Sequence, residues 1–305
     1  MRLLLQFPEG LKKLALEKAR EYEAQGHEVF ISSAQCFGAC DLAFEEARAV
    51  KADKIVHFGH AEFLGAKAAM PIPVEYVEFP IDVSLAPVMR KAIAALNAKK
   101  CGKVGLVTTV QHVQQLPSLR SMLEKAGKTV VVGRGTRTKY EGQILGCDTI
   151  AAASIAKDVD CILYFGGGLF HPLGVGSEGG SGKPVLVADP FANSVKWLDA
   201  KDEEKRKKGL LTRAILAKTF GILVSTKTGQ FSLEAARAAK KRLEAKGKRA
   251  EILVSNFVDF EALENFQSFD AYINTACPRL RDDYERARKP VLNLADVEEL
   301  LKLLQ

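Results

Sequence analysis

Short apolar segments recur along the whole chain and alternate with segments whose apolar residues have helical spacing. The apolar segments lie at residues 3–7, 29–32 and 54–58, at 104–107, 129–132 and 161–165, and at 221–224, 250–254 and 271–273. They are rich in Val, Ile and Leu and show little polar alternation, which is typical of parallel strands covered on both faces. The pattern therefore predicts an α/β fold.

One order of elements occurs three times within this pattern. In each repeat a strand is followed by a helix, then by a glycine, then by a second strand. Glycine tolerates the left-handed backbone that often ends a helix. The predicted helices span residues 11–25, 116–125 and 233–245, and the glycines are Gly26, Gly127 and Gly247. Each repeat is therefore interpreted as a βαβαβ unit, whose right-handed crossovers bring the strand C-termini to one edge.

The repeats predict three domains, at residues 1–83, 84–194 and 195–305. The boundaries are placed near 80–87 and 191–208, where Pro, polar and charged residues interrupt the strand and helix patterns. An alternative interpretation is one continuous doubly wound sheet with an added C-terminal domain. The threefold recurrence of helix, glycine and strand favours the three-domain interpretation.

Composition narrows the class of protein. The chain has 305 residues, of which 47% are hydrophobic and 27% charged, as in globular proteins. No apolar stretch approaches the roughly 20 residues that span a bilayer. The short apolar start lacks the longer hydrophobic region of a signal peptide, so we expect a cytoplasmic protein. In a reducing compartment the six cysteines are better explained by packing, metal binding or catalysis than by disulfides.

The net charge of +7 is compatible with an acidic partner. The densest charged segment, Lys201 to Lys208, mixes both signs and has no interleaved aromatic residues, as expected of a solvated helix. Nucleic-acid binding is therefore not the expected function.

Three cysteines follow predicted strands, one in each repeat. Cys40 and Cys147 each follow the second strand of their repeat, in the similar contexts GACD and GCD, and Cys277 follows the last strand of the third repeat. We expect Asp41 to cap the following helix. Pro278 has no backbone N–H to continue a strand, so the strand ends before it and the chain turns beside Cys277.

The other three cysteines have different settings. Cys161 opens an apolar strand, and Cys101 lies in a polar lead segment, so packing or surface roles are expected for both. Cys36 lies four residues before Cys40, and a ligand or auxiliary role for it stays open. The usual Cys-x3-Cys-x2-Cys loop of radical S-adenosylmethionine enzymes is absent, because Ala43 occupies its third position.

Three thiolates on three strand ends suit a 4Fe-4S cluster with one iron left open, which the amino and carboxylate groups of S-adenosylmethionine can occupy. A structural zinc site normally has four ligands in closely spaced pairs, a pattern that the chain lacks. Zinc is the weaker interpretation.

Several further segments resemble one family. FPEGL at 7–11, GACD at 38–41, GQILGCD at 142–148, FGGGLFHPLG at 165–174, STKTGQ at 225–230 and ACPRL at 276–280 together resemble the archaeal-type diphthamide synthase family. The resemblance implies an atypical radical enzyme in which Cys40, Cys147 and Cys277 hold a 4Fe-4S cluster at the centre of the three domains. It also implies transfer of the 3-amino-3-carboxypropyl group of S-adenosylmethionine to a histidine of elongation factor 2, with methylthioadenosine as the second product.

The candidate contacts for S-adenosylmethionine lie near predicted strand ends, and Asp189 follows a further predicted strand at 184–188. A glycine run after a strand lets the backbone approach a ligand closely, although it can equally be a plain loop. Arg279, beside Cys277, can meet a carboxylate in bidentate fashion or cap local backbone. The other candidates can serve in packing as well as in binding. The full set is Gly166, Gly167, Gly168, Gln111, His112, His171, Asp189 and Arg279.

Two other functions remain open at this stage. One is a quinolinate-synthase-like enzyme, which also combines three α/β units with three cysteines. The other is a noncatalytic binding module stabilised by a metal. For the leading interpretation, the expected partners are elongation factor 2, an electron donor and a second copy of the chain in a homodimer.

Overall fold

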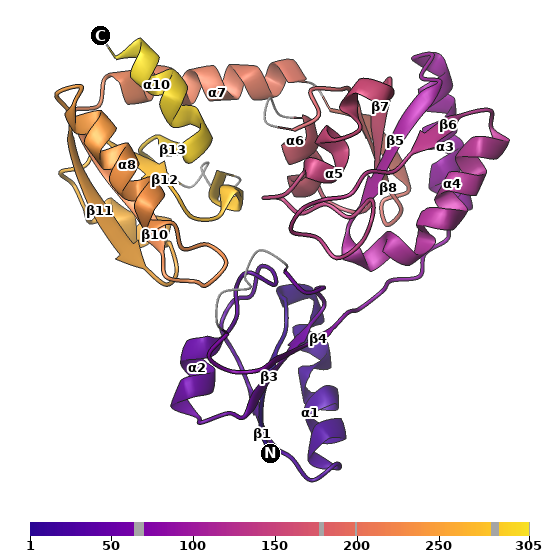
Figure 1. Cartoon of the computed structure of the whole chain (residues 1–305), viewed down its shortest axis with the longest axis horizontal. Helices are drawn as coiled ribbons and strands as arrows, with labels where there is room; N and C mark the ends of the chain where they lie inside the picture. Colours follow the sequence, from indigo (N-terminus) through magenta and orange to yellow (C-terminus); the bar gives the residue numbers. More distant parts are fainter. Residues whose placement is uncertain (64–69, 177–179, 199, 282–286, 305) are drawn as a thin grey trace. The chain divides into compact units, whose positions relative to one another are not determined.

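A computed structural model describes residues 1–63, 70–176, 180–198, 200–281 and 287–304. The chain forms two compact units, residues 1–198 and 199–305. Figure 1 labels their helices and strands. The first unit contains two β-sheets and the second contains one. The partition into domains at 1–83, 84–194 and 195–305 stays a prediction.

The three sheets share one topology. In each, the first strand lies between the second and third, and the fourth follows the third; the orders are β2-β1-β3-β4, β6-β5-β7-β8-β9 and β11-β10-β12-β13. All neighbouring strands are parallel except β9, which runs antiparallel to β8. The predicted α/β fold with three parallel-dominated sheets is confirmed.

The strands are short. Those of the first unit are β1 (Arg2–Gln6), β2 (Glu28–Ile31), β3 (Lys54–Phe58), β4 (Val74–Val77), β5 (Lys103–Thr108), β6 (Thr129–Val131), β7 (Cys161–Phe165), β8 (Val185–Asp189) and β9 (Ser194–Trp197). Those of the second unit are β10 (Thr219–Ser225), β11 (Arg249–Ser255), β12 (Ala271–Asn274) and β13 (Val291–Asn293).

The α-helices of the first unit are α1 (Ala15–Glu23), α2 (Phe44–Ala49), α3 (Ala86–Ala98), α4 (Leu116–Lys125), α5 (Ile150–Ala153) and α6 (Phe170–Gly176). Those of the second are α7 (Ala200–Ile215), α8 (Leu233–Glu244), α9 (Phe260–Glu264) and α10 (Val297–Leu303). Short 3-10 turns precede several of them, at Glu9–Leu14, Val110–Gln115 and Leu294–Asp296, and others lie at Ala156–Asp158 and Pro278–Arg281.

Helices cover both faces of each sheet, which explains the continuous apolar runs. In the first sheet Leu3 and Leu5 pack with α1, whereas Leu4 packs with α2. The second sheet packs against α3 and α4 on one face and α5 and α6 on the other. The third packs against α7, α8 and α10 on one face and α9 on the other. Successive residues of the central strands β1, β5, β7 and β10 are therefore buried almost throughout.

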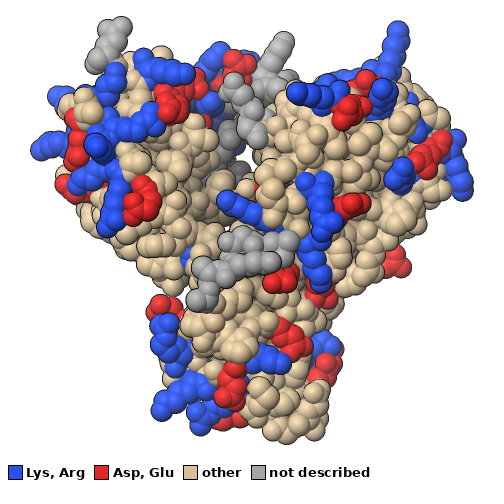
Figure 2. Space-filling view, viewed as in Figure 1, with Lys and Arg blue, Asp and Glu red and all other residues tan. Residues whose placement is uncertain are grey.

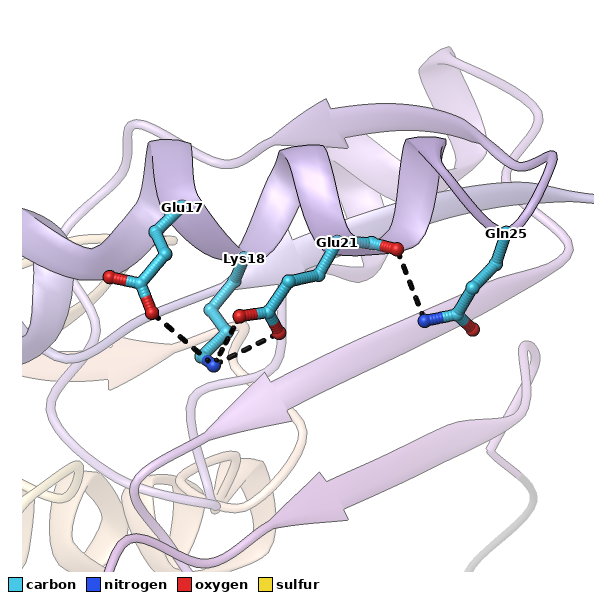
Figure 3. A network of polar contacts seen from close by, with 4 residues as sticks. All are labelled: Glu17, Lys18, Glu21 and Gln25. Atoms are coloured by element: carbon cyan, nitrogen blue, oxygen red, sulfur yellow. Dashed lines mark hydrogen bonds and ion pairs between the residues drawn. The ribbon is translucent and has the colours of Figure 1, made fainter.

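Amphipathic helices complete these layers. Leu119 and Leu123 of α4, one turn apart, are fully buried, and Pro117 occupies the first turn, where its missing N–H is not needed. On α1 the solvent face carries a polar network: Lys18 Nζ lies 2.8 Å from Glu21 Oε1 and 3.6 Å from Glu17 Oε1 (Figure 3). Gln25 Nε2 donates to the Glu21 carbonyl at 3.1 Å. Exposed pairs of this kind contribute little to stability, because water and salt screen their attraction.

Some local predictions were incomplete or wrong. The strands β4, β9 and β13 were not predicted. The boundary segment 191–208 contains the unpredicted β9 and the start of α7, and α7 agrees with the helix expected at 201–208. Asp41 is not the N-cap residue of α2, because Ala43 holds that position and makes no side-chain cap. The Asp41 carboxylate accepts a hydrogen bond from the Phe37 N–H at 3.2 Å.

Across the described part of the chain, none of the helices combines the length and apolar character needed to cross a membrane.

Candidate metal centre at the strand ends

The shared topology places a crevice at the same position in each sheet. Because the second and third strands lie on opposite sides of the first, the chain leaves the first and third strands in opposite directions. Ligands of open α/β sheets bind at the carboxyl ends of the strands beside such a switch point. The loops after β1 and β3, after β5 and β7, and after β10 and β12 are therefore the first places to look for a site.

The Cys40 loop is attached to the end of β1 by Gln6. The Gln6 side chain is buried; its Nε2 donates to the Asp41 carbonyl at 2.7 Å, and its Oε1 accepts from the Ala43 N–H at 3.2 Å. The buried Asp41 carboxylate closes the loop on Phe37. Cys40 itself is half-buried.

The Cys147 loop is attached to the end of β5 in a comparable way. The Thr108 N–H donates to the Gly142 carbonyl at 2.8 Å, and the Ile144 N–H donates to the Thr108 carbonyl at 2.9 Å. The buried Asp148 carboxylate accepts from the N–H groups of Thr136, Arg137 and Ile150 at 3.1, 2.7 and 3.0 Å. The expected similarity of the GACD and GCD segments thus has a physical basis. In both, the carboxylate of the aspartate after the cysteine accepts hydrogen bonds from backbone N–H groups of the same loop.

The surroundings of Cys147 are crowded although the residue itself is exposed. Gly146 has the Phe170 ring of α6 where a Cβ would lie. Desolvation raises the pKa of the Cys147 thiol, and the neighbouring Arg137 acts in the opposite direction. The Cys147 loop and the helix after the glycine run therefore pack on each other.

The Cys277 loop is held by the end of β12 and by β10. Asn274 Nδ2 donates to the Cys277 carbonyl at 2.9 Å, and the Ala276 N–H donates to Asn274 Oδ1 at 2.9 Å. Thr275 Oγ1 donates to the Leu223 carbonyl at 2.8 Å. Cys277 is half-buried. The side chain of the predicted contact Arg279 lies outside the described residues.

The six cysteines divide by exposure. Cys40 and Cys277 are half-buried and Cys147 is exposed, whereas the other three are buried. Cys101 and Cys161 lie in one hydrophobic core cluster, where burial and the Cys101 thiol raise the pKa of Cys161. Their expected packing role agrees with this setting.

The glycine run continues directly from β7. Gly166 and Gly168 have φ values of +150° and +76°, which residues with side chains rarely adopt. Gly167 faces the Phe191 ring, which a Cβ at Gly167 would approach to 3.0 Å. Gly166 is buried, Gly167 half-buried and Gly168 exposed. The backbone of Gly167 and Gly168 is thus the accessible part of this run.

Two other predicted contacts lie near this run. The half-buried His171 of α6 stacks on Tyr164 with ring centroids 6.4 Å apart and packs edge-on to Phe170. Asp189 Oδ1 accepts from the N–H groups of Phe191 and Ala192 at 2.8 and 3.0 Å, so it shapes the turn after β8.

The predicted contacts Gln111 and His112 are engaged with the protein. Gln111 Nε2 donates to the Gly59 carbonyl at 2.9 Å, which links the ends of β3 and β5. His112 is buried, its Nδ1 lies 3.0 Å from Gln115 Oε1, and its ring packs edge-on against Phe165. Burial lowers the pKa of His112.

Sequence reasoning missed a polar group at the end of β3. His57 Nε2 lies 2.9 Å from His60 Nδ1, and burial lowers the pKa of both, that of His60 to about 4. Tyr76 Oη is buried and finds no hydrogen-bond partner within the described residues. Burial, with smaller contributions from the charges of Glu62 and Cys40, raises the pKa of Tyr76 to about 12. The segment HFGH at 57–60, with two histidines at the end of a predicted strand, could have indicated this polar group from the sequence.

Basic and acidic side chains are interspersed over the visible face (Figure 2). The pairs that form are mostly local, as between Lys208 and Glu204 of α7 at 2.7 Å. This distribution agrees with the mixed charge expected from the sequence.

Comparison with known proteins gives a consistent result. The family model for diphthamide synthesis proteins matches residues 7–305. The chain is 38% identical over 306 aligned residues to 2-(3-amino-3-carboxypropyl)histidine synthase of Pyrococcus horikoshii, covering 99% of this chain and 86% of that protein. It is 29% identical to subunit 1 of the synthase from Nematostella vectensis, covering 96% of this chain and 62% of that subunit.

Comparison with solved structures supports the same family. A crystal structure of Dph2 from Pyrococcus horikoshii with a 4Fe-4S cluster matches with a TM-score of 0.90 and 37% identity, covering 99% of this chain and 86% of that chain. With the family model spanning nearly all of the sequence, this chain belongs to the family of diphthamide synthesis proteins.

Proposed function

We propose that this chain is a 2-(3-amino-3-carboxypropyl)histidine synthase, the transferase of the first step of diphthamide biosynthesis. The observation that carries the proposal is its 38% identity to the Pyrococcus horikoshii enzyme over 99% of the chain. The substrates would be S-adenosylmethionine and a histidine of elongation factor 2. The bond between the sulfonium sulfur and the γ-carbon would break, and methylthioadenosine would be the second product.

The available donors fit a 4Fe-4S cluster held by Cys40, Cys147 and Cys277. Iron of such clusters takes cysteine thiolates, and these are the accessible thiols at strand ends. The other three cysteines are buried. Three ligands would leave one iron open for the amino acid part of S-adenosylmethionine.

When bound, the cluster supplies one electron to the sulfonium. The protein chain positions the three cysteine ligands of the cluster. Asp41 and Asp148 hold the loops that carry Cys40 and Cys147, and Asn274 holds the Cys277 loop. Orientation decides which carbon–sulfur bond of the cosubstrate breaks, because the sulfonium has three. Ligands carried on separate, individually braced loops favour an orientation different from that of a single three-cysteine loop.

We place the cosubstrate near the glycine run. Gly167 and Gly168 expose backbone at the end of β7, with Asp189 of β8 and His171 of α6 close by. Gly166, Gln111 and His112 would act indirectly, because their groups are buried or engaged within the fold. Arg279 remains a candidate for the carboxylate of the cosubstrate.

The partners follow from this function. We propose elongation factor 2 as the protein substrate, an external electron donor, and a homodimer in the cytoplasm. Because one chain holds all three candidate ligand cysteines, each protomer would carry its own cluster.

Product analysis tests the function. Purified protein is reconstituted anaerobically, reduced with dithionite in the presence of S-adenosylmethionine and elongation factor 2, quenched and chromatographed. We expect methylthioadenosine and modified elongation factor 2, with little 5′-deoxyadenosine. Dominant 5′-deoxyadenosine would overturn the proposal even if a cluster were present.

Cysteine variants test the ligand set. Cys40→Ala, Cys147→Ala and Cys277→Ala should each abolish cluster assembly, measured as iron and sulfide content after anaerobic reconstitution. Cys101→Ala and Cys161→Ala are the matched controls and should retain the cluster, because their thiols lie in the core. A full cluster in any of the first three variants would remove that cysteine from the ligand set.

A further inference from the structure

A second group of metal-binding side chains lies in the first sheet. Cys36 follows β2, His57 is in β3, and His60 follows β3. One ligand atom from each lies within 4.8 Å of the other two. Cys36 and His57 are buried and His60 is half-buried. One thiol and two imidazoles are donors that borderline divalent metals such as Zn²⁺ prefer.

The hydrogen bonds of Gln6 fix the tautomer of His57. Because Gln6 Nε2 donates to the Asp41 carbonyl and Gln6 Oε1 accepts from the Ala43 N–H, the amide cannot be reversed without losing both bonds. Gln6 Oε1 also lies 2.9 Å from His57 Nδ1. His57 must therefore carry its proton on Nδ1, which leaves a lone pair on Nε2.

That lone pair points to the other members of the group. His57 Nε2 lies 2.9 Å from His60 Nδ1, so a single proton lies between the two rings. A metal ion can replace this proton, as metal binding to histidine generally requires. The bond from His57 Nδ1 to an amide oxygen is the outer contact that ligating histidines usually make, and it fixes the ring orientation.

The spacing is close to that of a real site. With Zn–N bonds of about 2.0 Å and a Zn–S bond of about 2.3 Å, tetrahedral ligand atoms lie about 3.3–3.5 Å apart. Here the two nitrogens lie 2.9 Å apart and all three atoms lie within 4.8 Å. Movements on the order of 1 Å, within the reach of small side-chain rotations, would therefore complete the geometry.

We propose that Cys36, His57 and His60 bind one Zn²⁺ ion, with a water molecule in the fourth position. Tyr76 supports an occupied site: its ring lies edge-on to His57 at 5.5 Å, and its buried hydroxyl finds no partner in the described chain. The ion would link the loop at Cys36 to the end of β3. Because Cys40 lies in the same loop, the site would brace the segment that carries it. The proposal does not depend on the reaction that the protein catalyses.

Metal analysis of the reconstituted protein tests the site. The full chain is purified anaerobically, reconstituted with iron and sulfide, incubated with Zn²⁺ and washed with a weak chelator. Zinc, iron and sulfide are then measured together, and zinc-edge X-ray absorption gives the first-shell donors. We expect about one zinc ion per chain beside an intact cluster, with two nitrogens and one sulfur in the first shell.

Variants make the assignment specific. Loss of an outer contact alone weakens metal binding about 10–100-fold, so loss of a ligand in Cys36→Ala or His60→Gln should reduce retained zinc at least about tenfold. The controls Cys101→Ala and His112→Gln change another buried thiol and another buried imidazole and should keep it. Wild-type protein without zinc, unchanged zinc in the two variants, or a sulfur-rich first shell would overturn the proposal. So would loss of iron in Cys36→Ala with iron kept in His60→Gln, since Cys36 would then serve the cluster rather than the zinc site. The absorption measurement on the wild type decides the matter even if a variant misfolds.

Discussion

A methyl group added at Gly146 should loosen the loop that carries Cys147. A Cβ at this position would overlap with the Phe170 ring, which provides its three nearest atoms, and the Gly146 backbone is outside the left-handed region, so the ring is the main obstacle. Overpacking of this kind costs about 1–3 kcal/mol. Alanine also lowers the entropy of the unfolded chain, which offsets about 0.4–1 kcal/mol. We therefore expect Gly146→Ala to lower the free energy of unfolding by about 1–2 kcal/mol.

Trp197 provides a local probe of this loss. It is the single tryptophan of the chain and lies in β9 of the same sheet. Urea unfolding under anaerobic conditions, followed by Trp197 fluorescence, gives the stability of that sheet. The control Gly102→Ala should be nearly neutral, because a Cβ there would lie 3.6 Å from Asp160 Oδ2, an ordinary contact.

A double-variant cycle separates the ring from other causes. If Phe170 is the obstacle, Gly146→Ala should cost less in a Phe170→Ala background than alone, with a coupling energy of about 1–2 kcal/mol. Equal costs in both backgrounds would refute the steric explanation. An unchanged unfolding midpoint for Gly146→Ala alone would refute the predicted packing of the loop on α6.

Three further changes have defined outcomes. Asp148→Asn should destabilise the same sheet by about 2–4 kcal/mol in the Trp197 assay, because the amide cannot accept all the backbone N–H bonds that the carboxylate accepts. A loss of stability smaller than the error of the assay would contradict this role of Asp148. Burial holds the pKa of His112 in the folded protein below the ordinary 6.5. The unfolded chain therefore binds a proton at a higher pH than the folded protein does, so the free energy of unfolding should fall as the pH drops below 6.5. His112→Gln should flatten this pH dependence, and an unchanged slope would contradict the role of His112. Gly209→Ala, at an exposed and unobstructed position inside α7, should stabilise the protein by about 0.5–1 kcal/mol in thermal unfolding followed by circular dichroism, and a loss of stability would contradict the helix there.

The repeated architecture could be predicted from the sequence because its strands are buried on both faces. Such strands appear as apolar runs, and the glycines after their helices mark the repeats. The strands β4, β9 and β13 are only three or four residues long, and they were missed because they lie outside the repeated order of helix, glycine and strand that marks the equally short β2 and β6. Their pattern cannot be told from that of a loop.

The site could be predicted only in part. Position after a strand identified the three accessible cysteines. Position could not tell whether a polar side chain turns outward or into the fold: His112 turns inward, and Gln6 and His57 serve a buried network that begins inside apolar strands. Asp41 was expected at a helix cap, but its carboxylate bonds within its own loop because α2 begins three residues later. The orientation of these polar side chains depends on contacts between segments that are distant in the sequence.

The inward-turned aspartates after Cys40 and Cys147 bear on metal selectivity. A free carboxylate beside a thiolate would offer oxygen as well as sulfur and would attract hard cations such as Mg²⁺ and Ca²⁺. Asp41 and Asp148 are buried, and their oxygens accept bonds from backbone N–H groups of their own loops. Each loop therefore presents a soft donor without a competing hard one, and the residue that shapes the loop also limits which metals it can hold.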